Sequence, residues 1–191
     1  MAVIIGACSA GIFSSIGLFV SYYLSKQKDY ESKRIDSALE HLERQIEELY
    51  GPLLGLLRNS YLIFEVSTKI LPMLDDLSYD FKNFTEEDYK RYDYFTETYF
   101  LPINAKIAEL INTKITLIEK QNMPESFKKF LNHQIEYECI HNLMKEGKKY
   151  KESDFPLSIR DYPVDFMKDV EIQLEKYTNT YQKYLNDKIK I

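Results

Sequence analysis

The chain has 191 residues, of which 45% are hydrophobic and 14% aromatic, and its net charge is −5. This length is enough for one domain with a sizeable core after an N-terminal segment is set aside. The negative charge argues against a nucleic-acid binder, which usually carries an excess of Lys and Arg. The two cysteines argue against a disulfide framework, and six glycines with six prolines argue against a disordered or strand-rich chain.

The N-terminal run from Ala2 to Leu24 contains no charged side chain. Roughly 20 apolar residues cross the hydrocarbon core of a bilayer as an α-helix. The sequence therefore predicts a transmembrane anchor over residues 1–25. A cleaved signal peptide, or a lipoprotein signal at Ile5–Cys8, is less favoured because no Lys or Arg precedes Lys26 and the apolar run is long.

Basic residues follow this run and do not precede it: Lys26, Lys28, Lys33 and Arg34. Positively charged flanks of a membrane helix stay in the cytoplasm. We therefore expect a single-pass protein of the inner (cytoplasmic) membrane, with its N-terminus outside and residues 26–191 forming a cytosolic helical domain.

Small residues recur at every fourth position of the run, at Ala7, Gly11 and Ser15. On a helix these positions share one face, and small residues let two membrane helices approach closely. This stripe is a candidate packing face for a second copy, although membrane helices are commonly rich in small residues.

A seven-residue apolar repeat follows the predicted anchor and indicates a helical stripe. Its members are Ile35, Leu39, Leu42, Ile46, Leu49, Leu53 and Leu56. The stripe fits either a dimeric coiled coil or packing on the chain's own helices, and its shortness favours the second. Gly51-Pro52 predicts a kink or a new helix start within a long helix over 26–71.

The rest of the chain also reads as helical, over 85–188. Residues 73–84 are expected to form a loop, and Thr85–Asp88 resembles a capping box. Helices are predicted up to Pro102, over 103–120, over 125–146 and from Pro163 to about Lys188. No strand pattern is visible. The sequence thus predicts an all-α fold, an antiparallel bundle of about five helices after the anchor.

Three polar residues fall on predicted apolar faces: Lys114, His133 and Glu136. Because buried charges need partners, we expect these three to form one interior polar cluster. Alternatively, Lys114 reaches solvent and Glu136 lies at the edge of its face. A single His-Glu pair is too few ligands for a metal site in a helical bundle, and no catalytic motif is present. The sequence names no catalytic residue, cofactor or metal, and leans against an enzyme.

Several short motifs occur in a characteristic order. They are Gln45–Leu53 (QIEELYGPL), Tyr99–Pro102, Thr113-Lys114, Pro124–Phe127, His133 and Tyr162-Pro163. In these the chain resembles a group of small bacterial proteins with one N-terminal membrane helix, some of which are carried on mobile elements. Members of that group have a His at the position of Asn104 in this chain. They also have a Trp near the position of Met144. The resemblance implies architecture and no activity.

We therefore expect a membrane-anchored helical module for interaction or oligomerisation, with the bilayer, a second copy or another protein as partner. The resemblance adds a candidate role as a membrane effector in phage defence or in mobile-element maintenance. Two alternatives stay open: an enzyme or ligand sensor that uses Lys114, His133 and Glu136, and a passive membrane scaffold. Nucleic acid is not an expected partner.

Overall fold

The computed structural model describes residues 2–75, 78–118, 123–148, 163 and 165–189, with side chains from Leu18 onward. The chain divides into two compact units. One consists of Arg44–Tyr177, and the other combines Met1–Glu43 with Thr178–Ile191.

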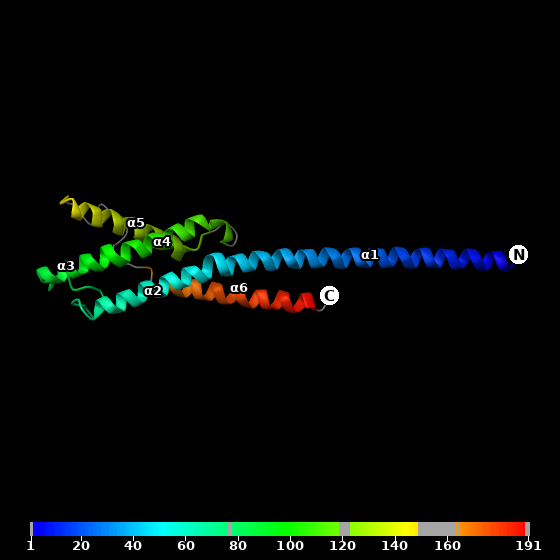
Figure 1. Ribbon diagram of the computed structural model, residues 1–191, viewed down its shortest axis with the longest axis horizontal. Helices are drawn as coiled ribbons and strands as arrows, with labels where there is room; N and C mark the ends of the chain where they lie inside the picture. The colour runs from blue at the N-terminus through cyan, green and yellow to red at the C-terminus, as the bar shows by residue number, and fades with distance from the viewer. Residues whose placement is uncertain (1, 76–77, 119–122, 149–162, 164, 190–191) are drawn as a thin grey trace. The chain divides into compact units, whose positions relative to one another are not determined.

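The described residues fold almost entirely as helices (Figure 1). In chain order they are α1 (Ala2–Gln45), the π-helical turn η1 (Ile46–Tyr50), α2 (Gly51–Thr68), α3 (Glu86–Phe95), the π-helical turn η2 (Thr96–Phe100), α4 (Leu101–Thr113), the 3₁₀ turn η3 (Ile115–Leu117), α5 (Glu125–Lys145) and α6 (Asp165–Ile189). In this part of the chain the only sheet-like pairing is an isolated bridge between Met73 and Tyr79. The predicted all-α class is confirmed.

No helix among the described residues is long and apolar enough to cross a membrane. The predicted anchor, residues 1–25, lies mostly outside the residues whose side chains are described.

The smaller unit pairs α1 with the end of α6 (Figure 1). Asp36 of α1 forms an ion pair with Lys188 of α6, and Leu39 and Leu42 are buried. These leucines belong to the seven-residue apolar repeat. The prediction that this stripe packs on the chain's own helices is therefore confirmed here.

The larger unit holds most of the core, with α4 in contact with both α2 and α5 (Figure 1). Its fully buried side chains include Leu49, Tyr50, Leu53, Leu57, Ile107, Ile111, Phe127, Phe130, Phe166 and Val170. Each such apolar side chain contributes roughly 1.5–3 kcal/mol relative to an exposed one. Leu49 and Leu53 belong to the same seven-residue apolar repeat of the sequence and are buried within this unit.

Several predicted helix boundaries are confirmed. Thr85 caps α3: its hydroxyl accepts a hydrogen bond from the Asp88 N–H, and the Asp88 carboxylate accepts one from the Thr85 N–H. The predicted helices over 125–146 and from Pro163 to Lys188 correspond to α5 and α6.

The predicted helix over 103–120 is wrong in its second half, because α4 ends at Thr113. Lys114 has φ −109° and ψ 20°, outside the helical region, and a 3₁₀ turn follows it. Residues 114–118 therefore do not continue the helical face on which their positions were predicted, and the last two residues of the predicted helix lie outside the described residues.

Candidate functional site

Two π-helical turns lie in the stretches IEELYGP and TETYFLP. In the first, the Gly51 N–H bonds to the Ile46 carbonyl, and in the second the Leu101 N–H bonds to the Thr96 carbonyl. In each case a proline, Pro52 or Pro102, is the second residue after the turn. Proline lacks an N–H and its ring clashes with the carbonyl four residues earlier, so a wider turn there relieves both problems. At Pro102, where the sequence predicts an end or a kink of the helix, the chain continues from η2 into α4.

The geometry of the first turn explains why position 51 is a glycine. A Cβ at Gly51 would lie 2.8 Å from the Ile46 carbonyl oxygen, a backbone atom that cannot rotate away. Gly51 is therefore required by the turn itself. The IEELYGPL stretch therefore specifies this backbone geometry through Gly51 and Pro52.

The structure does not bring the three residues of the predicted polar cluster together. Lys114 donates a hydrogen bond to Glu48 over 2.8 Å and is partly exposed to solvent. Glu136 lies instead on the stretch of α5 beside Thr96, because the Thr96 and Tyr137 hydroxyls are 2.8 Å apart. Lys114 lies beyond the far end of α4, roughly 25 Å from Thr96 at the helical rise. Lys114 thus has a different partner from the one expected.

His133 and Glu136 are buried on α5, as the sequence predicted, with 9% and 8% of their surface exposed. The His133 ring stacks on the Tyr137 ring, with centroids 5.8 Å apart and planes 12° from parallel. Glu136 Oε2 and Asn104 Oδ1 are buried acceptors with no hydrogen-bond partner among the described residues. The same residues contain no group of His, Cys, Asp and Glu side chains able to hold a metal.

The main buried polar network of the larger unit is phenolic. The Tyr137 hydroxyl lies 2.8 Å from the Thr96 hydroxyl and 3.3 Å from the Tyr92 hydroxyl. The Tyr79 hydroxyl, 2.6 Å from Ser67 Oγ, extends the cluster, and the Tyr79 and Tyr92 rings pack edge to face. We call Ser67, Tyr79, Tyr92, Thr96 and Tyr137 the tyrosine cluster.

Burial makes the phenols of this cluster weak acids. It raises the pKa of Tyr79 to about 12, against the effect of the Ser67 hydrogen bond. It also raises the pKa of Tyr92 well above its ordinary value, and that of Tyr137 in the same direction. A phenol that ionises only above its ordinary range is a poor base at neutral pH. The three phenols therefore stay protonated at neutral pH and serve as hydrogen-bonding groups within the larger unit.

An ion cluster lies at the surface beside the second turn. Glu97 receives hydrogen bonds from Lys145 at 2.8 Å and from His141 at 3.2 Å. These bonds, that of Lys145 foremost, hold the pKa of Glu97 below its ordinary value, and the pKa of Lys145 is raised in turn. The carboxylate is exposed, so the cluster fastens α5 to η2 only weakly.

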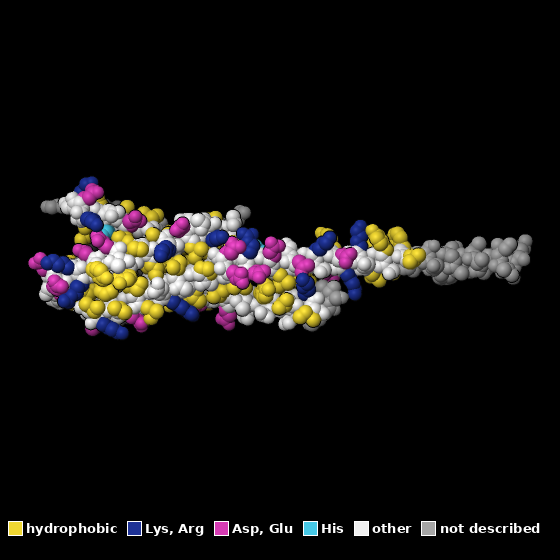
Figure 2. Space-filling view, viewed as in Figure 1, with side chains coloured by type: hydrophobic (Ala, Val, Ile, Leu, Met, Phe, Trp, Pro, Cys, Tyr) yellow, Lys and Arg dark blue, Asp and Glu magenta, His cyan; other side chains and the backbone are white. Residues whose placement is uncertain are grey.

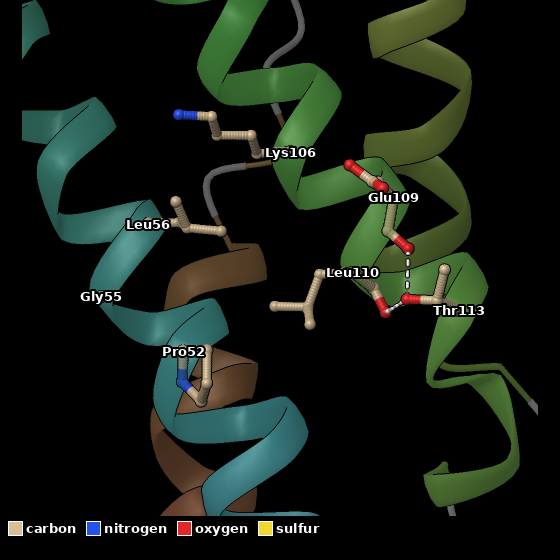
Figure 3. Close-up of a pocket in the computed structure, with 7 residues that line it drawn as sticks. All are labelled: Pro52, Gly55, Leu56, Lys106, Glu109, Leu110 and Thr113. Carbon is tan, nitrogen blue, oxygen red and sulfur yellow. Dashed lines mark hydrogen bonds between the residues drawn. The ribbon is translucent and has the colours of Figure 1, made fainter.

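A shallow groove of about 520 Å³ runs between α2 and α4 (Figure 3). It is lined by Pro52, Gly55, Leu56, Lys106, Glu109, Leu110 and Thr113. Leu56 and Leu110 point toward one another across it, while Lys106 and Glu109 stand on the α4 side. The lining is mostly apolar with one charge of each sign, which suits contact with another protein surface better than catalysis.

The groove adjoins an exposed apolar face of α2. Leu62 and Val66 are about half exposed and share the helix face of Gly55, since they follow it by seven and eleven residues. Figure 2 shows hydrophobic side chains gathered over α2 and α3 on the visible side of the molecule. Contiguous exposed apolar surface of this kind marks contact sites. The groove together with Leu62 and Val66 is called the α2 face below.

Sequence reasoning missed the tyrosine cluster and the α2 face. The tyrosine cluster joins residues more than 40 positions apart, which no local periodicity reveals. The α2 face had a signal in the glycine and apolar residues at one helical spacing from Gly55 to Val66. The small-residue stripe Ala7, Gly11 and Ser15 lies outside the residues whose side chains are described.

Comparison with known proteins gives no further guide: no family model, no curated protein and no solved structure matches this chain.

Proposed function

We propose that the protein is a single-pass membrane-anchored interaction module, with a helical domain on the cytosolic side that binds protein partners through the α2 face. It acts by bringing a binding surface to the inner membrane.

The observation that carries this proposal is the continuity of α1. One unbroken helix begins at Ala2, within the uncharged run, and ends at Gln45, next to the first π turn. A run of more than 20 residues without charge is long enough for a bilayer, and it is already helical in backbone conformation. The Lys and Arg residues that follow it support the cytosolic side for the domain.

The α2 face supports the interaction role. Tyrosine and aliphatic side chains are exposed on α2 and α3, including Tyr61, Leu62, Val66 and Tyr94. The polar groups buried beneath them form the tyrosine cluster, which lacks an activated group. The candidate roles in phage defence and mobile-element maintenance rest on the sequence resemblance alone.

Alkaline extraction of membranes tests the anchor. We expect the wild-type protein, expressed in a bacterial host, to stay in the membrane pellet at alkaline pH. The double variant Ile12→Arg/Ile16→Arg should move to the soluble fraction, because two charges at mid-bilayer each cost about 2.5–3.5 kcal/mol. Ser37→Arg, an equal change at an exposed site of α1, should stay in the pellet. Wild-type protein in the soluble fraction would refute the proposal.

The native thiols test the orientation. Cys139 is exposed, and Cys8→Ser removes the chain's other cysteine. In intact spheroplasts a membrane-impermeant maleimide should leave Cys139 of this variant unlabelled, and it should label Cys139 after lysis. Labelling before lysis would place the domain on the opposite side.

A further inference from the structure

We propose that the groove between α2 and α4 is the contact site for a second copy of this chain. This inference rests on the proposed function, in that it names the partner of the α2 face.

Gly55 supplies the first observation. A glycine inside a helix is destabilising relative to alanine, because its backbone loses more conformational freedom on folding. At Gly51 the fold requires it, but a Cβ built at Gly55 meets no atom within 4 Å. The described part of the chain therefore gives no internal reason for glycine at position 55. Close approach by a second backbone is a reason that lies outside the chain.

The surroundings of Gly55 supply the second observation. The groove places Leu56 and Leu110 beside it, and the exposed Leu62 and Val66 extend the same helix face. A second helix laid along this face would bury apolar side chains at helical spacing, as helix-in-groove contacts do. The missing Cβ at Gly55 would let that helix lie closer to α2.

The charges on the rim favour a copy of the same chain. Lys106 and Glu109 are exposed, stand one helical turn apart on α4 and form no ion pair among the described residues. A binding site for a strongly charged partner would present one sign. In a two-fold dimer every contact occurs twice, so Lys106 of each copy can meet Glu109 of the other. The rim is thus self-complementary.

Membrane anchoring would strengthen this contact. Copies held in one bilayer share a thin layer beneath it, which raises their effective concentration. A contact of modest area, which would be too weak to hold a dimer together in dilute solution, is then sufficient for two anchored copies to associate.

A charge-swap experiment on the full-length protein tests the proposal. Two differently tagged copies are co-expressed and chemically crosslinked in intact membranes, and the crosslinked pairs are then solubilised in a mild detergent and measured by co-purification. Lys106→Glu alone and Glu109→Lys alone should each weaken association about tenfold, because like charges meet twice. Copies of one single variant mixed with copies of the other should associate again, and so should the double swap K106E/E109K.

Gly55→Leu gives an independent test. It fills the point of closest approach and should reduce association about a hundredfold, while leaving the helical circular dichroism unchanged because the site is open. Asn112→Leu, at an exposed site of α4 outside the groove, is the matched control and should associate like the wild type.

Three outcomes would overturn the proposal. One is wild-type association in both Gly55→Leu and the single charge variants. A second is association lost only in Gly11→Leu, which would place the contact in the N-terminal run. The third is a crosslink to a different protein that the double swap weakens. Alkaline extraction of the same samples reports anchoring separately, so failure of the groove is distinguishable from failure of the membrane proposal.

Discussion

The two π turns share a design but differ in what holds them. Each lies between two α-helices, puts an N–H five residues after its carbonyl partner and precedes a proline. At the closing position the first turn has Gly51, where a Cβ would lie 2.8 Å from the Ile46 oxygen, whereas the second turn has Leu101. The first turn therefore requires glycine at its closing position, whereas the second turn accommodates a leucine side chain there.

The side-chain partners of the turns also differ. Beside the first turn, the buried Gln45 amide donates to the Leu117 carbonyl over 2.7 Å. In the second, the buried Thr96 hydroxyl bonds to Tyr137. The same π-helical backbone is thus stabilised in two ways. At the first turn a side-chain amide bonds to a distant backbone carbonyl, and at the second turn a hydroxyl bonds to a buried tyrosine.

The largest expected effect comes from filling the first turn. Gly51→Ala should lower the free energy of unfolding by about 2–3 kcal/mol, because its Cβ forces the backbone of Ile46 to shift. Urea unfolding in detergent, followed by circular dichroism, measures it. Leu101→Ala, which keeps a Cβ at the matching position of the second turn, should cost less. Equal losses in both variants would show that the turns do not differ in this respect.

Alkaline pH should weaken the tyrosine cluster around the second turn. The native pKa of Tyr79, about 12, lies above the ordinary value of 10.0. Between these values the unfolded chain releases the proton first, so stability is complete below pH 10 and falls by up to about 1.4 kcal/mol per pH unit above it. Unfolding series from pH 9 to 11.5 should show a shallower fall in Tyr79→Phe. An identical slope in both proteins would contradict the expected shift.

Removing the hydroxyl that anchors the second turn should have a moderate effect. Thr96→Val keeps the shape but deletes the hydrogen bond to Tyr137, at a cost of about 1–2 kcal/mol. The same unfolding measurement applies, and the ultraviolet band of the tyrosines should shift as Tyr137 loses a partner. Thr98→Val, at an exposed site of the same turn, is the control and should change stability little.

The smallest effect sharpens the contrast between the two glycines of α2. Gly55→Ala should raise the free energy of unfolding by about 0.5–1 kcal/mol, since alanine is the better helix former and its Cβ meets nothing. The melting temperature should rise accordingly. A loss of stability would mean that position 55 resembles position 51 and needs glycine for the fold.

Local signals made part of this fold predictable. The capping box at Thr85 and Asp88 depends on residues three apart, so the sequence alone was enough to place it. The burial of His133 and Glu136 followed from helical periodicity, because α5 is regular from Glu125 to Lys145. In both cases the sequence signal lies within one element.

Features that need a change of backbone geometry or a distant partner were not predictable. Lys114 was placed on a helical face, but the helix ends one residue before it and its partner is Glu48. Pro102 predicted an end or a kink of its helix, and the local sequence did not show that a π turn would carry the chain past it. Glu97 meets His141 and Lys145 only because α5 packs against η2. Nothing in local spacing encodes these pairings.

The π turns have a consequence for how sequences related to this one will align. A π turn holds one residue more than the α-helical turn it replaces, so the helix faces on either side keep their relation when that residue is lost. A relative without proline at position 52 or 102 would therefore carry a one-residue gap within 46–50 or 96–100 and still fold alike. Such a gap marks a change of helical pitch and no change of architecture.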